Sequence, residues 1–473
     1  MSIRIVVMRT LLGTILVLSA LVIRGAVAPT NPAPAGATGG VSRLLLPLSL
    51  AEALDVALQQ NSAIRKSAAN LEATYGVIVQ TRAIALPRVT IGSAYSANAE
   101  GATDELKAEG VPGDDPLLTR AFVYANQRWS SDIRVTQSIY EGGRINSSLR
   151  SARLTRDAAL LNHETVIANA LRDVRVAYYD TLLAQELIAV QEASLKLLER
   201  ELSETTKRLR AGTVPQFNVL RAEVEVANAR PKLIRAKNAF RKGKDRLATL
   251  LGEKIPTGTD ELALQLTDKL QVPAWQVDLT NAVALAFAQR TELMALRKSR
   301  QLRDEDVVSA KSGYKPSVQI FAGYGAQSSQ FSRDLTEEVH GWEAGAQLQW
   351  NIFDGFLTKG RVREAEGLRL RSSEELAEAE RDVELEVRTA YSSFIEAREV
   401  LVSQEKVQES AEESLRLASA REAAGAATQL DVLDAQTALT DARSTKAVAW
   451  HEYAVARARL ERAVGQKIEQ THR

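Results

Sequence analysis

The chain has 473 residues, and its 60 Lys and Arg side chains balance 59 Asp and Glu side chains, so no net field draws it to nucleic acid. Aromatic residues make up only 5% of the sequence, and the abundance of Ala, Leu, Glu and Arg favours long helices. Because there is no cysteine, disulfides, thiolate metal sites and a lipid-anchored amino-terminal cysteine are excluded.

Residues 1–28 are typical of a signal peptide. Arg4 and Arg9 precede the apolar run LLGTILVLSALVI, which is shorter than a membrane-spanning helix. The small residues AVA at 26–28 offer a cleavage site, and a retained amino-terminal anchor is the alternative. Residues 29–47 are then expected to form a flexible leader. No later segment has the unbroken apolar length of a spanning helix, so any membrane crossing by this exported protein has to be made by strands.

Residues 48–252 and 279–465 form an internal repeat. Glycine, proline and tryptophan recur in a fixed register, which favours a duplication over chance matches between alanine-rich helices. The offset is 213 positions, and it is 229 upstream of a gap between 96 and 128. Matched pairs include Gly212 with Gly425, Trp129 with Trp342, Gly252 with Gly465, and Pro87 with Pro316. Residues 253–278 are expected to link the copies, and 466–473 to form a short tail.

Each copy contains the same predicted elements in the same order. Helical apolar spacing, over 48–86 in the first copy, ends before a proline. Two segments that alternate apolar and polar residues follow, and they predict four strands per chain. A helix of almost 70 residues then runs to Gly212 in the first copy and to Gly425 in the second. A helix of about 35 residues returns to Gly252 or Gly465. The junctions between strands and helices are predicted at Pro87, Gly142, Pro316 and Gly355.

The alternation favours strands with one lipid face and one water-filled face, because the narrow helical seams are used by the helices on one another. Trp342 and Trp350 lie near the two ends of such a strand, where membrane girdle residues occur. Four strands cannot close a barrel, since known single-chain barrels have at least eight and an open edge in lipid leaves backbone groups unpaired. The barrel must therefore be shared among chains, and periodicity alone allows two chains or three.

The duplicated helix–strand–strand–helix–helix order, the junctions YEG and FDG, and the sequence GAATQLDVLDAQTAL at 425–439 resemble the TolC-type outer membrane efflux proteins over about residues 48–465. The resemblance implies a homotrimer with a transmembrane β-barrel of twelve strands in the outer membrane and an α-helical barrel across the periplasm. It also implies a periplasmic adaptor protein and an inner-membrane pump as partners. We therefore expect an outer membrane exit duct that conducts substrates passively. The alternative is a periplasmic coiled-coil scaffold or adaptor without a membrane barrel.

The same resemblance assigns Asp431 and Asp434 to the periplasmic entrance, which they would constrict. Helix capping alone would also explain Asp431, whereas Asp434 lies three residues further on the same face. In the family, a Tyr and an Arg upstream of the motif pair with these aspartates. At the corresponding positions this chain has Glu422 and Ala427, and Asn218 occupies the place of an aspartate in the first copy. The helix-turn tips are expected to contact the adaptor through Gly212, Asn218, Gly425 and Asp431.

The sequence suggests no catalytic centre, metal site or cofactor. Its four histidines, His163, His340, His451 and His472, are scattered. There is no phosphate-binding glycine loop, nucleophile elbow or metalloprotease motif. We therefore expect no enzyme activity.

Overall fold

The computed structural model describes residues 47–97, 127–254, 262–328 and 339–465. All of them belong to one compact unit, Pro47–Arg473. The expected signal peptide, the leader up to residue 46 and the tail lie outside the described residues.

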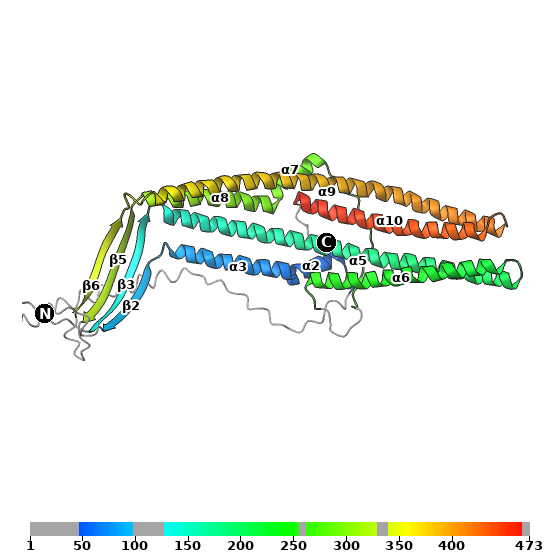
Figure 1. The fold of residues 1–473 in the computed structure, drawn as a ribbon, viewed down its shortest axis with the longest axis horizontal. Coiled ribbons are helices and arrows are strands. Elements are labelled where there is room, and N and C mark those ends of the chain that lie inside the picture. The colour runs from blue at the N-terminus through cyan, green and yellow to red at the C-terminus, as the bar shows by residue number, and fades with distance from the viewer. Residues whose placement is uncertain (1–46, 98–126, 255–261, 329–338, 466–473) are drawn as a thin grey trace, which may run out of the picture. The chain divides into compact units, whose positions relative to one another are not determined.

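The same order of elements occurs twice along the chain (Figure 1). The first series is α2 (Leu50–Gln60), α3 (Ser62–Ala83), β2 (Arg88–Ala97), β3 (Gln127–Glu141), α5 (Arg144–Arg210) and α6 (Gln216–Leu251). The second series is α7 (Leu279–Gln289), α8 (Thr291–Lys311), β5 (Ser317–Ser328), β6 (Val339–Gln349), α9 (Leu357–Ala423) and α10 (Gln429–Val464). The two long helices have 67 residues each and the two returning helices 36 each, as a duplication requires.

The first helix of each copy is broken in two, which the apolar spacing over 48–86 did not indicate. Asn61 ends α2 and caps α3, because its side-chain oxygen accepts from the N–H groups of Ala63 at 2.8 Å and Ile64 at 3.2 Å. Its side-chain amide donates to the carbonyl oxygen of Leu250 at 2.6 Å. Arg290 occupies the same position between α7 and α8. A cap residue can stop a helix without disturbing its apolar period.

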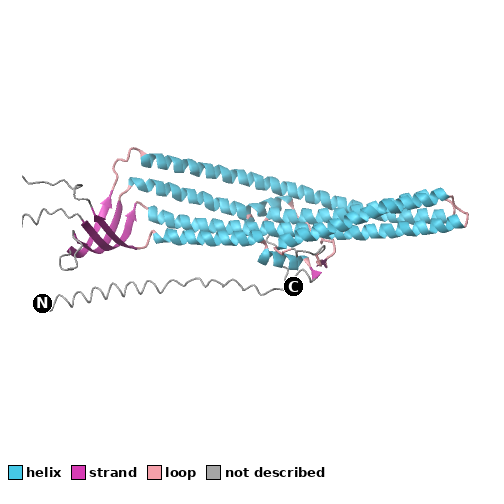
Figure 2. Cartoon of the chain, turned by 60° about the horizontal axis from the view of Figure 1, so that its bottom comes forward, coloured by secondary structure: helices cyan, strands magenta, loops and turns pink. Residues whose placement is uncertain are grey.

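The four long strands form one antiparallel sheet (Figure 2), in the order β2-β3-β5-β6 (Figure 1). The pairing of β3 with β5 joins the two copies. One face of the sheet is apolar and uncovered within the described chain: Ile91 is 78% exposed and Trp342 79%. The opposite face carries Arg134, Glu343 and Phe321 among small and polar residues. β2 and β6 are left at the two edges.

The helices cover one another and leave the sheet free. α5 packs along α3, α6 and α8, α9 packs along α8 and α10, and α10 also contacts α5. A short parallel pair, β1 (Pro47–Leu48) with β4 (Gln265–Leu266), joins the link between the copies to the start of the first. One apolar core is built by α7, α8, α9 and α10, around Phe394, Leu460 and Leu293. No helix among the described residues combines the length and apolar character needed to cross a bilayer.

Candidate functional site

Two helix-turn tips lie at the ends of the long helices opposite to the sheet (Figure 1). The first tip joins α5 to α6 and the second joins α9 to α10. Gly212 and Gly425 adopt φ values of 72° and 73° there, a left-handed conformation that side chains disfavour. Asn218 lies in the first turn of α6 and is half-buried.

Asp431 is part of a capping box at the start of α10. Its Oδ2 accepts from the backbone N–H and from the hydroxyl of Thr428, both at 2.8 Å. The Asp431 N–H donates to Thr428 Oγ1 at 3.3 Å in return. The Thr428 backbone N–H first, and then its hydroxyl, lower the pKa of the Asp431 carboxyl below its ordinary value. Capping therefore accounts for Asp431 within one chain.

Asp434 has no such explanation. Its side chain is exposed, and it makes no hydrogen bond or ion pair within the described part of the chain. Val432, Leu433 and Ala435 are buried on the other side of the helix. Asp431 and Asp434 thus share the exposed side of α10, with only Asp431 engaged locally.

A polar link joins the two tips to each other. Arg208, in the last turn of α5, forms an ion pair with Glu422, in the last turn of α9. This hydrogen bond raises the pKa of Arg208. The side-chain amide of Gln429 donates to Thr205 Oγ1 at 2.7 Å. The sequence did not reveal the link, because Arg208 and Glu422 are far apart in the chain and only the packing of α10 on α5 brings them together.

The junction residues lie between strands and helices, although they differ in their surroundings. Pro87 and Pro316 directly precede β2 and β5. Gly142 has a φ of 63°, and a Cβ atom there would lie 2.6 Å from the carbonyl oxygen of Ser312. Gly142 is therefore a point of close approach between the copies. Gly355 also has a positive φ, 66°, but open space around it.

The two tryptophans occupy different positions. Trp342 is in β6, opposite Tyr324 on the apolar face. Trp350 follows the end of β6, and its indole Nε1 donates to the carbonyl oxygen of Tyr314 at 3.1 Å. Trp350 therefore lies where the sheet meets the helices, with its polar atom directed toward the helical side.

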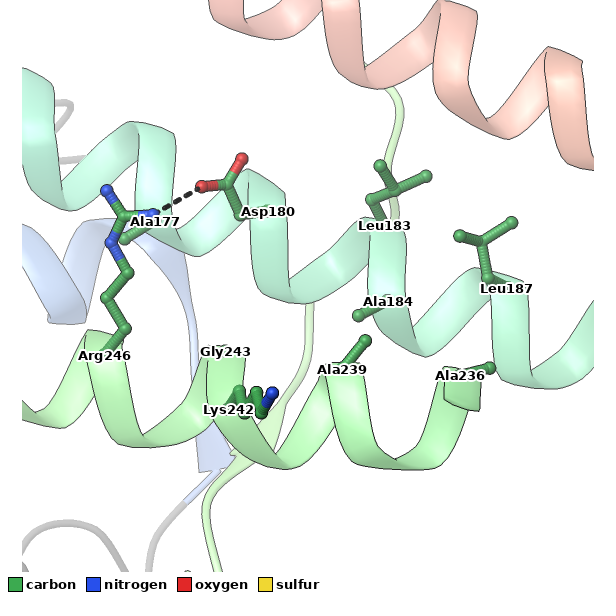
Figure 3. A pocket seen from close by; sticks show the side chains of 10 residues that line it. All are labelled: Ala177, Asp180, Leu183, Ala184, Leu187, Ala236, Ala239, Lys242, Gly243 and Arg246. Carbon is green, nitrogen blue, oxygen red and sulfur yellow. Dashed lines mark ion pairs between the residues drawn. The ribbon is translucent and has the colours of Figure 1, made fainter. Parts of the chain in front are cut away.

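A cavity of about 310 Å³ lies between α5 and α6, and its lining includes small side chains such as Ala184 and Ala239 (Figure 3). An ion pair between Asp180 and Arg246, with an N–O distance of 3.6 Å, lies at one end. Asp180 is also 2.7 Å from the Nε2 atom of His451 on α10. These contacts tie three helices together. Within the described residues, no group of three or more His, Cys, Asp or Glu is placed to hold a metal ion.

Comparisons with known proteins agree with this fold. The model of the outer membrane efflux protein family matches residues 53–253 and 282–466. Outer membrane protein TolC of Escherichia coli is 24% identical over 89% of this chain and 84% of its own length. TolC of Vibrio cholerae is 24% identical over 92% and 94% of the two chains. The Campylobacter jejuni CmeC outer membrane channel shares the fold, with a TM-score of 0.73 at 15% identity over 90% of this chain and 87% of its own.

The family match covers most of both copies of the repeat, and the structural neighbour is a channel rather than an enzyme. The sheet, the long helices and the tips are the parts that the family model spans. The chain therefore belongs to the outer membrane efflux protein family and is an exit duct of the outer membrane.

Proposed function

We propose that three copies of the chain assemble into one duct, which receives substrates from an inner-membrane pump and a periplasmic adaptor and conducts them passively out of the cell. The observation that carries this proposal is the four-stranded sheet, with an exposed apolar face and two open edges, at the end of helices of 67 residues. In this organisation residues 1–28 direct export, and the two copies each contribute one strand pair and one helical hairpin.

The apolar face favours a lipid environment for the sheet. Val89, Ile91, Tyr95 and Trp342 are all more than half exposed within one chain, and apolar surface of this kind is unfavourable in water. A scaffold with a small soluble sheet would need helices to cover this face. Here the helices pack on one another instead, which favours the duct over the scaffold.

The open edges of the sheet favour a barrel that several copies of the chain close together. Backbone groups left unpaired at β2 and β6 would each cost several kcal/mol in lipid, by a general estimate of about 2–7 kcal/mol for an unbonded amide. Pairing β2 of one copy with β6 of the next removes both edges. Two copies supply eight strands and three supply twelve, and the resemblance to a trimeric family favours three.

The tips form the periplasmic entrance in this arrangement. Asp431 and Asp434 of three copies would supply six carboxylates around it, while the corresponding positions of the other three tips hold Asn218 and Arg221. Carboxylates held close together favour bound cations, and acidic rings make a pore cation-selective. The turns at Gly212 and Gly425 would contact the adaptor.

Fractionation of cells that produce the protein tests the proposed location. The duct should sediment with outer membranes and need detergent for its release. Added to a planar bilayer, the purified protein should form ion-conducting channels. Recovery in the soluble periplasmic fraction, without channel activity, would support the scaffold instead.

A further inference from the structure

The polar face of the sheet carries an ion pair that crosses a strand. Arg134 on β3 and Glu343 on β6 are separated by β5, where Gly323 is the residue in register with both. Because glycine has no side chain, the Arg134 guanidinium passes over β5 and pairs with the Glu343 carboxylate. The ring of Phe321 lies 5.3 Å from the guanidinium carbon and helps to hold it against the sheet.

Structural stability does not account for this pair. The side chains of Arg134 and Glu343 are 45% and 54% exposed, so both face solvent. A pair of this kind contributes about 0–1 kcal/mol to folding. The backbone ladder already joins β3 to β5 and β5 to β6.

On the same face, the residues in register across the strands form rows, and the rows on either side of the pair each hold one charged side chain. One row toward the far end of the sheet, Asp132 lies among Gly92 on β2 and two glycines on β5 and β6. One row toward the helices, Arg88 is in register with Thr136. These three rows therefore hold two positive and two negative side chains, and in the middle row the charges cancel.

We propose that Arg134 and Glu343 neutralise each other in the middle of the outer membrane wall of the duct, so that this part of the bore does not select ions by charge. This inference rests on the proposed function, because it requires the polar face of the sheet to line the bore. Three copies place three such pairs at one level. A neutral ring there leaves selection by charge to the entrance, and loss of one partner exposes three like charges to passing ions.

Reversal potentials across a salt gradient in planar bilayers test this pairing. The measurements use the full chain with Asp431→Asn and Asp434→Asn, so that the acidic entrance does not mask the effect. Glu343→Gln should shift selectivity toward anions, because it leaves Arg134 uncompensated. Arg134→Gln should shift it toward cations. The double variant Arg134→Gln/Glu343→Gln should return to the selectivity of the starting protein.

The controls separate this inference from the proposed function. Glu343→Asp keeps the charge and should leave selectivity unchanged, and it is the comparison for Glu343→Gln if Arg134→Gln does not assemble. Channels whose selectivity is the same with and without the Glu343 charge would overturn the inference while leaving the duct intact. A double variant that keeps a shift would also overturn it. Absence of channels from the unmodified protein would instead overturn the proposed function.

Discussion

At the scale of single residues, the two aspartates of α10 differ in their hydrogen bonding within one chain. The Asp431 carboxylate completes a capping box with Thr428, and these hydrogen bonds lower its pKa. A lowered pKa means that the ionised cap is complete above the ordinary carboxyl value of 3.8 and is lost only as the pH falls through the lower folded value. Asp434 has no local partner among the described residues, so its charge is available to the proposed entrance.

We expect Asp434→Asn to weaken block of the channel by trivalent cations applied from the periplasmic side. The change removes three carboxylates from the entrance and leaves the cap at Asp431 intact. Thr428→Ala is the matched control, because it removes the capping hydroxyl and keeps both charges, so block should persist. Dose–response curves in planar bilayers provide the measurement. Unchanged block in Asp434→Asn would mean that Asp434 does not face the entrance.

Sequence patterns anticipated some of these residue roles and missed others. Capping by Asp431 was one of the two explanations that the sequence offered, because caps depend on neighbours a few residues apart. The pair between Arg208 and Glu422 was not predictable, since it joins two helical hairpins. The pair between Arg134 and Glu343 was also not predictable, because it depends on the register of three strands.

At the scale of elements, periodicity predicted the types and order well. The long and returning helices were expected at almost 70 and about 35 residues, and they have 67 and 36. The break at Asn61 was not predicted, because the apolar spacing gives no sign of it. Strand alternation identified the two faces of the sheet, whereas the pairing of β3 with β5 depends on tertiary structure and not on local pattern.

A charge on the apolar face of β6 should impair assembly. Ala346 lies on that face between Trp342 and Trp350, so Ala346→Arg should cost about 2–4 kcal/mol near mid-membrane. Gln347→Arg is the matched control, since the next residue of a strand points to the opposite face. Yields of assembled protein in outer membranes would compare the two. Equal yields would argue against a lipid-facing position for Ala346.

The link between the tips should restrain the entrance. Glu422→Arg places two arginines together at the ends of α5 and α9, so we expect larger single-channel conductance or more frequent opening. The exchange Arg208→Glu/Glu422→Arg restores opposite charges and should restore the conductance and opening frequency of the unmodified protein. Because the Arg208 side chain is 43% exposed, the effect should weaken at high salt. A charge exchange that behaves like the single variant would show that the pair does not restrain the tips.

At the scale of the whole molecule, duplication within the chain and the proposed assembly between chains serve different purposes. Duplication supplies two strand pairs and two helical hairpins of equal length, yet only the second hairpin carries the paired aspartates. The two edges of the sheet are β2 and β6, and in the proposed assembly other copies close them. The number of copies follows neither from the sequence pattern nor from one chain, because eight and twelve strands both satisfy the edges.

Native mass spectrometry of the protein released from detergent micelles tests the shared barrel most directly. The absence of cysteine means that no disulfide can hold the copies together, so any assembly observed rests on noncovalent contacts. We expect a single dominant species with the mass of three chains, stable without cross-linking. A dominant dimer, which would close eight strands, or a monomer would contradict the twelve-stranded duct.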